Sequence, residues 1–188
     1  MTSESESAAP LTRHRLIICG LDELGDHSRA GVSHVVSILD PETPVPSAVI
    51  GYPDLRAHRV LRFHDVSQRI GDARVPEAED VAELLSFGME LQALESGANL
   101  LIHCHAGVSR STAAAAILLG QHAPGREREV MREIVRLRPI AWPNARMVQL
   151  ADEALGRNGA FTDALRQLRS RRLDDTVSRG WLGGFFRR

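Results

Sequence analysis

The sequence predicts an α/β fold: a single domain with a mostly parallel central sheet flanked by helices. Three observations lead to this prediction. The short apolar runs are continuous rather than alternating, which is typical of strands covered on both faces. Helical patterns separate most of these runs, as they do in units of strand, helix and parallel strand. The chain has 188 residues, 43% of them hydrophobic and 25% charged, which suits one ordinary globular domain with room for tails.

The first half of the chain carries three predicted strands. Residues 16–19 (LIIC) end at a glycine, residues 34–39 (HVVSIL) end at Asp-Pro, and residues 59–64 (RVLRFH) end at a polar loop. Residues 22–30, between the first two strands, are expected to form a short helix. The prolines of residues 40–58 predict a loop.

In the second half, helices alternate with one more strand. Pro76 occupies a favourable first helical position, and the apolar residues after it recur at steps of three and four. A later helix rich in alanine and leucine is expected to stop at Gly120, and Asn144 is expected to cap the last helix. The expected elements are, in order, a polar loop at 65–74, a helix from 76 to about 94, a strand at 99–103, and helices at 109–119, 126–138 and 144–155.

Composition divides the chain into three segments. Residues 1–12 are rich in Ser, Glu, Ala, Pro and Thr, which predicts a disordered tail, and residues 13–159 form the predicted domain. Residues 160–188 are expected to form a basic tail or helix, whose last eight residues, WLGGFFRR, contain three aromatic ones. Such a segment usually packs on its own domain or is disordered; the alternative is contact with a membrane surface.

Charge and targeting signals favour a cytoplasmic protein without a nucleic-acid partner. The net charge is −1, which gives no electrostatic reason to expect binding to nucleic acid. The N-terminus lacks the basic start and apolar stretch of a secretory signal, and the longest apolar run, residues 113–119, is far shorter than a membrane span. The histidines and cysteines do not have the spacing of a zinc site, and nothing in the sequence indicates an oligomeric state.

One stretch, residues 103–111 (HCHAGVSRS), combines a nucleophile with an anion site. It runs from a buried strand into the start of a helix, so the N–H groups from His105 to Arg110 can surround one point just above the sulfur of Cys104. The helix dipole and the Arg110 guanidinium favour a thiolate, and cysteines in such places titrate at about 3.5–7.5. The same N–H groups can hold a tetrahedral dianion, Arg110 can grip two of its oxygens, and Gly107 allows the tight turn. The stretch therefore predicts phosphoryl transfer to sulfur.

The motif His-Cys-x-x-Gly-x-x-Arg-Ser is the signature of the Cys-dependent protein tyrosine phosphatase superfamily, and the chain resembles its compact dual-specificity branch. The apolar run LLI before the motif, the alanine-rich helix after it, and residues 138–144 (RPIAWPN) with Gln149-Leu150 behind them are similar to that branch. The resemblance covers about residues 13–156. It implies hydrolysis of phosphate monoesters in two steps, through a cysteinyl-phosphate intermediate and without a metal or other cofactor.

The resemblance also implies roles for individual residues. Cys104 would be the nucleophile, Arg110 the phosphate clamp, and Ser111 the donor to the sulfur as it leaves. His103 would hold the loop and help to lower the pKa of the thiol, and Asn144 would brace the loop from behind. The residues whose main chain or side chain would bind the phosphate are His105, Ala106, Gly107, Val108, Ser109 and Arg110.

A general acid must protonate the leaving oxygen and then activate water. In the family this group is an aspartate on a loop after an earlier strand. Asp65 fits, because it directly follows the strand predicted at 59–64 and lies 39 residues before Cys104, at the same sheet edge. Asp72, in the same loop, is the alternative.

The favoured substrate is protein phosphotyrosine, with phosphoserine, phosphothreonine or a small phosphoester also open. Phosphoinositide or RNA 5′-phosphate is the alternative, but phosphatases for these substrates often carry basic residues within the loop, and here none precedes Arg110. Outside the enzyme class, the alternative is a phospho-binding pseudophosphatase. Cys19, the only other cysteine, is expected to be a core residue; the alternative is a thiol that traps oxidised Cys104 as a disulfide.

Overall fold

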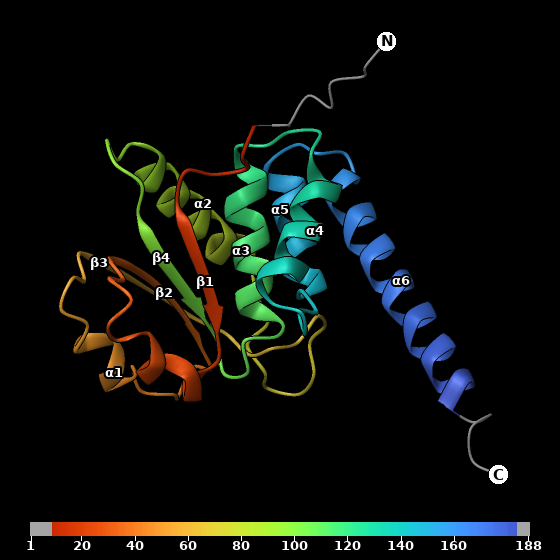
Figure 1. The fold of residues 1–188 in the computed structure, drawn as a ribbon, viewed down its shortest axis with the longest axis horizontal. Helices are drawn as coiled ribbons and strands as arrows, with labels where there is room; N and C mark the ends of the chain where they lie inside the picture. The colour runs from red at the N-terminus through yellow and green to blue at the C-terminus, as the bar shows by residue number, and fades with distance from the viewer. Residues whose placement is uncertain (1–8, 184–188) are drawn as a thin grey trace.

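The computed structural model describes the main chain of residues 9–183 and the side chains of residues 9–174. Within these residues, one sheet contains the strands β1 (Arg15–Cys19), β2 (His34–Leu39), β3 (Ala57–Arg62) and β4 (Asn99–His103), in the order β1-β4-β2-β3 (Figure 1). Every pairing of these strands is parallel. The predicted α/β class with a parallel central sheet is therefore confirmed, and the carboxyl ends of the strands meet at one edge.

Helices cover the two faces of this sheet unequally. In the described part of the chain they are η1 (Leu21–His27, a 3-10 helix), α1 (Ser47–Ile50), α2 (Ala78–Gln92), α3 (Arg110–Gln121), α4 (Glu127–Leu137), α5 (Ala145–Ala154) and α6 (Ala160–Gly183). Figure 1 shows α2 to α5 gathered on one face and η1 and α1 on the other. Helix α6 packs against α4 and α5, and its later turns extend away from the rest of the chain (Figure 1).

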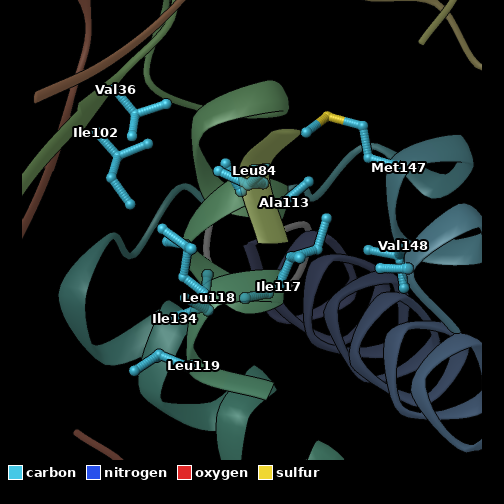
Figure 2. Close-up of a cluster of buried hydrophobic side chains, with 14 of the residues drawn as sticks. Val36, Leu84, Ile102, Ala113, Ile117, Leu118, Leu119, Ile134, Met147 and Val148 are labelled. Atoms are coloured by element: carbon cyan, nitrogen blue, oxygen red, sulfur yellow. The ribbon is translucent and has the colours of Figure 1, made fainter. Parts of the chain in front are cut away.

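Helix α3 lies at the centre of the larger hydrophobic core. Its alanines, residues 113–116, are fully buried, and their small side chains let the sheet and the neighbouring helices approach closely. Figure 2 shows Ile117 of α3 facing Val148 of α5, with Ile102 of β4 in the same cluster. The strand and the helix that flank residues 104–109 are therefore both fixed by the core.

The end of α3 differs from its predicted position. The helix does not stop at Gly120 but continues to Gln121. A Cβ at Gly120 would lie 2.8 Å from Cζ of Phe161 on α6, so this glycine makes room for a ring rather than ending a helix. The prediction was wrong because the partner ring comes from a segment 41 residues further along the chain.

Other elements also differ from their predicted bounds, among them the strand predicted at 59–64, which is β3 and ends at Arg62. Helix α2 begins at Ala78 rather than Pro76, because Glu77 takes the N-cap position and its N–H donates to the Asp80 carboxylate (2.9 Å). The helix expected at 22–30 is the shorter η1, and the loop expected at 40–58 contains the single turn of α1 and the start of β3. In contrast, the capping role expected of Asn144 at the start of α5 is confirmed.

The hydrophobic core continues past residue 159, where the sequence predicted the end of the domain. Phe161, Ala164 and Leu165, on the first turns of α6, are buried in it. Three other expectations lie outside the described residues: the first eight residues of the predicted N-terminal tail, the side chain of Trp181, and Phe185 and Phe186. None of the helices within residues 9–183 has the length and apolar character needed to cross a membrane.

A buried carboxylate, Asp152 on α5, holds the start of α6. It accepts hydrogen bonds from the N–H groups of Gly159 (2.7 Å), Phe161 and Thr162 (both 2.8 Å). Burial opposes ionisation of this carboxyl, but the main-chain donors outweigh that effect and lower the pKa of Asp152. The ionised carboxylate therefore stabilises the folded state.

We expect Asp152→Asn to lower the free energy of unfolding by about 1–3 kcal/mol at pH 7, because an amide oxygen accepts these bonds less well than a carboxylate. Since the pKa of Asp152 is lower in the folded state than in the unfolded one, this contribution is complete above the ordinary aspartate value of about 3.9 and is lost as the pH falls below it. Urea unfolding of both proteins at pH 7 and near pH 3 measures the difference, with the exposed neighbour Glu153→Gln as the control. A difference that grows at low pH would contradict this account.

Candidate active site

The loop of residues 104–109 lies at the carboxyl edge of the sheet, between the end of β4 and the start of α3. The predicted strand–loop–helix setting of the HCHAGVSRS stretch is therefore present. Cys104, the first residue of the loop, is 1% exposed. Its Sγ lies 3.2 Å from Oγ of Ser111, which is fully buried on the first turn of α3. A hydroxyl in this place can donate to a sulfur anion.

The carbonyl groups of loop residues 105–109 all accept hydrogen bonds from groups outside the loop. Main-chain N–H groups donate to three of them: Leu21 to the carbonyl of His105 (2.9 Å), Trp142 to that of Val108 (2.8 Å) and Asn144 to that of Ser109 (3.2 Å). The Arg138 side chain donates to the other two, through Nη2 to the carbonyl of Ala106 (3.2 Å) and through Nε to that of Gly107 (3.1 Å). In contrast, within residues 9–183 no protein acceptor pairs with the N–H groups of residues 105–109. The loop therefore presents a row of free main-chain donors, which suits an oxyanion.

Gly107 is the residue that lets the loop fold in this way. Its φ is +67°, a left-handed conformation that residues with a side chain rarely adopt. A Cβ there would also lie 2.5 Å from the carbonyl carbon of Cys19 and 2.7 Å from Gly20 N, at the end of β1. Both the conformation and the close approach of two backbones require glycine.

The guanidinium of Arg110 is buried and held from one side. Its Nη1 donates to the Asp40 carboxylate (2.5 Å) and to the carbonyl oxygen of Phe63 (2.7 Å). Its Nε is buried and has no hydrogen-bond partner among the described residues. One nitrogen of the planar group is thus used for anchoring, and the opposite edge is left for an oxyanion.

Sequence reasoning missed Asp40. It directly follows β2, just as Asp65 follows the region of β3, so the placement of an acid after a parallel strand was the signal that could have identified it. Arg62 fixes the segment around it, because Nη1 of Arg62 donates to the carbonyl groups of Pro41 (3.0 Å) and Thr43 (2.7 Å). His105 also faces this segment: its Nε2 lies 3.4 Å from Oγ1 of Thr43 and 3.9 Å from Oδ1 of Asp40.

Of the two aspartates proposed as the general acid, only Asp65 contacts the loop. Its Oδ1 accepts hydrogen bonds from Oγ of Ser109 (2.6 Å) and from Nδ2 of Asn144 (2.9 Å). Asp72 is exposed and makes no hydrogen bond or ion pair with any described residue. The structure thus brings Asp65, and not Asp72, to the edge where Cys104 lies.

Asn144 connects the aspartate loop, the phosphate loop and α5. Its Oδ1 accepts from the N–H groups of Arg146 (3.1 Å) and Met147 (3.2 Å), which caps the helix. Its Nδ2 donates to Asp65, and its own N–H donates to the carbonyl of Ser109. Asn144 is 3% exposed, so its contacts with the three segments are buried.

A second ion pair, absent from the sequence reasoning, supports the outer side of the loop. Arg138 binds Glu23 of η1 through two hydrogen bonds of 2.7 Å each, while its Nε and Nη2 also reach loop carbonyls. The hydrogen bond from Arg138 lowers the pKa of Glu23. Glu23 in turn accepts from the N–H of Gly20 (2.6 Å), so the loop is joined to the end of β1.

His103, a predicted site residue, and Cys19, which was predicted to be a core residue, are both buried and uncharged at neutral pH. Burial lowers the pKa of His103 to about 4, so this ring adds no positive charge beside Cys104 and supports the loop as a neutral group. Burial raises the pKa of Cys19 to about 12. Cys19 packs in the small core under η1 and α1, whereas Cys104 belongs to the large one. No three His, Cys, Asp or Glu side chains of the described residues are arranged to hold a metal ion.

Comparison with known proteins identifies the fold. No family model matches the chain. No curated protein matches it either. Among solved structures, human DUSP28 has a TM-score of 0.56 and 20% identity, covering 85% of this chain and 96% of its own. A mouse putative dual specificity phosphatase complexed with zinc tungstate has a TM-score of 0.58 and 20% identity (87% and 98%). The human tyrosine phosphatase-like serine/threonine/tyrosine-interacting protein has a TM-score of 0.57 and 17% identity (80% and 97%).

Proposed function

We propose that this chain, which has the fold of the dual-specificity phosphatases, hydrolyses phosphate monoesters through a cysteinyl-phosphate intermediate. The observation that carries the proposal is the composition of one loop. Its first residue is a buried cysteine, its next five N–H groups have no protein acceptor within residues 9–183, and the arginine after them has a free buried edge. A nucleophile and a dianion site thus share a few residues.

In the first step, Sγ of Cys104 attacks phosphorus in line with the leaving oxygen. The S–P bond forms as the P–O bond breaks, and Asp65 gives its proton to the leaving oxygen. The three equatorial oxygens of the transition state receive hydrogen bonds from the N–H groups of the loop and from the free edge of Arg110. Most of the rate enhancement should come from this preorganised set of donors.

In the second step, a water molecule attacks phosphorus and the S–P bond breaks. Asp65 accepts the proton of the water, and inorganic phosphate leaves. The departing sulfur carries negative charge, which the Ser111 hydroxyl at 3.2 Å stabilises by donating to it. Asp65 suits both proton transfers because Ser109 and Asn144 hold it at the loop.

The charge around the loop supports phosphoprotein or a small phosphoester as the substrate. Asp40 is 34% exposed beside Arg110, and Glu42 nearby in the sequence is exposed as well. Carboxylates at the rim repel substrates that carry several phosphates, such as phosphoinositides and RNA ends. We therefore place phosphotyrosine first among the substrates, with phosphoserine and phosphothreonine next.

The test is turnover of p-nitrophenyl phosphate by the purified protein, with and without a chelator. We expect release of phosphate at the same rate in both cases, since no step uses a metal. Activity that is lost with the chelator would contradict the mechanism. Binding of tungstate without any turnover would instead show a phospho-binding protein rather than an enzyme.

We expect Arg110→Lys to lower kcat/KM at least about 10²-fold even though the charge is kept, which is the scale of removing a transition-state donor. The guanidinium uses Nη1 to bind Asp40 and Phe63 and offers its other edge to phosphate, whereas an ammonium group has no second edge. Steady-state kinetics on an aryl phosphate measures the loss. Arg59→Lys, at a half-exposed arginine paired with Glu90, is the control and should stay within twofold. If kcat/KM of the Arg110→Lys variant stays within a few-fold of the wild-type value, Arg110 has only a structural role.

A further inference from the structure

The segment between α4 and α5, residues 138–144, carries two supports of the phosphate loop. The N–H of Trp142 donates to the carbonyl of Val108 (2.8 Å), and the N–H of Asn144 donates to the carbonyl of Ser109 (3.2 Å). Val108 and Ser109 are also two of the loop residues whose own N–H groups have no acceptor in the described part of the chain. The position of this segment therefore determines where these free donors lie.

The segment has few hydrogen bonds of its own. Pro139 and Pro143 have no N–H group, and the bond that lies within the segment comes from the N–H of Ala141 (2.8 Å). The carbonyl groups of the two prolines are bound from α6 instead. Nη2 of Arg169 donates to the carbonyl of Pro143 (2.8 Å), and Nη2 of Arg172 donates to the carbonyl of Pro139. Both ends of the segment are thus held by one helix.

Arg169 also contacts the side chain of Trp142. The guanidinium carbon lies 4.9 Å from the centre of the indole ring, which is within the range of a cation–π interaction. The carbonyl that Arg169 binds, that of Pro143, belongs to the same peptide group as the N–H of Asn144. One guanidinium therefore contacts both parts of the segment that donate to the loop.

We propose that Arg169 is a positioning residue for the phosphate loop, on which it acts through residues 142–144. A charged donor at the Pro143 carbonyl polarises the peptide group and makes the N–H of Asn144 a stronger donor. The hydrogen bond from Asn144 to the Ser109 carbonyl has the same effect on the next peptide group, whose N–H is that of Arg110. Arg169 lies beyond residue 156, where the family motifs end, so these motifs do not include this support.

The consequence for catalysis rests on the phosphatase function proposed above, whereas the support of the loop does not. The test therefore begins with two readouts that need no turnover. One is the dissociation constant for tungstate, measured by calorimetry. The other is amide hydrogen exchange at Trp142 and Asn144, whose N–H groups bond to the loop. The reference amide is that of Val130 on α4, which bonds to the carbonyl of Arg126.

Arg169→Met keeps the apolar part of the side chain but removes the charge and the donor. We expect tungstate to bind about threefold to tenfold more weakly, because a charged hydrogen bond and a ring contact are lost. Exchange at Trp142 and Asn144 should be at least about fivefold faster, while exchange at Val130 should stay within about twofold. A helix that only stabilised the whole fold would change all three amides together.

Two other variants of α6 complete the comparison. Arg169→Lys can keep a charge over the ring and one hydrogen bond, so both readouts should return to within about twofold of wild type. The matched control is Arg166→Met, one turn earlier, at an exposed arginine that pairs with Asp163 on the same helix. This control should change neither readout.

The kinetic readout separates this role from acid catalysis. In Arg169→Met, kcat/KM should fall about threefold to tenfold, and by the same factor on substrates with poor and with activated leaving groups. Loss of the general acid Asp65 would instead give a larger effect on the poor leaving group. A leaving-group-dependent loss in Arg169→Met would therefore contradict an action through the anion site.

Two further results would overturn the proposal. One is an Arg169→Met variant that folds and binds tungstate as tightly as wild type. The other is exchange that rises as much at Val130 as at Trp142. If Arg169→Met does not fold, Arg169→Gln, which loses only the charge, must still weaken tungstate binding. If tungstate binding and exchange change as expected while phosphate monoesters are not hydrolysed, the proposed function fails and the positioning role of Arg169 stands.

Discussion

Cys104→Ser is expected to lower turnover of phosphate monoesters by at least about 10⁴-fold, the scale seen when a catalytic nucleophile is removed. A serine hydroxyl at this position is a far weaker nucleophile than a cysteine sulfur, and within the described residues the hydrogen-bond partner of Cys104 Sγ is Ser111, which is not a base. The anion site should survive, because its donors are main-chain N–H groups and Arg110. Tungstate should therefore still bind the variant, with an affinity within a few-fold of wild type by calorimetry.

The matched control is Cys19→Ser, at the other buried cysteine of the chain. It should keep wild-type activity to within a few-fold, because Cys19 packs in the smaller core on the far face of the sheet. The same Cys104→Ser protein also serves as a substrate trap, since a bound phosphorylated molecule would not be turned over. Full activity of Cys104→Ser would refute the mechanism.

Asp65→Asn is expected to lower kcat by about 10²–10⁴-fold on a substrate with a poor leaving group, the range for loss of a general acid. An amide oxygen can still accept the hydrogen bonds from Ser109 and Asn144, so the loop should keep its shape. The amide has no proton of the required acidity to give. With an activated aryl phosphate, whose leaving group needs little protonation, the loss should shrink. The ratio of the losses on the two substrates is the measurement.

Asp72→Asn is the control for this experiment, since Asp72 lies in the same loop without a contact to the site. We expect its effect to be within twofold on both substrates. If Asp72→Asn shows the leaving-group-dependent loss and Asp65→Asn does not, the acid has been assigned to the wrong residue. An equal loss on both substrates for Asp65→Asn would indicate instead that the loop has collapsed.

Much of the fold could be read from local sequence patterns. The strands β2 and β4 have the predicted bounds, because a continuous apolar run flanked by polar or turn residues defines a buried strand by itself. The start of the helix after Asn144 could be predicted from an equally local signal, since an N-cap side chain binds the N–H groups of the next three residues. The errors arose where contacts with a distant segment determine the structure. Gly120 was predicted to end a helix, but the helix continues, and the glycine is needed because the ring of Phe161 packs against it.

The motif from His103 to Ser111 identified, without any structure, the loop of the candidate site. Its spacing is set within one strand, one loop and one helix start, so sequence alone is enough. What the sequence could not give is the order of the strands, β1-β4-β2-β3. That order places the residues after β2 and near the end of β3 beside the loop after β4.

Only the tertiary structure therefore brought Asp40 to Arg110, favoured Asp65 over Asp72, and placed Ser37 between His58 and His103. These pairs are 21 to 70 residues apart in the chain. The physical reason is that contacts across a parallel sheet depend on which strands become neighbours. Which strands become neighbours depends on the packing of the whole core around α3, so it cannot be predicted from any single stretch of sequence.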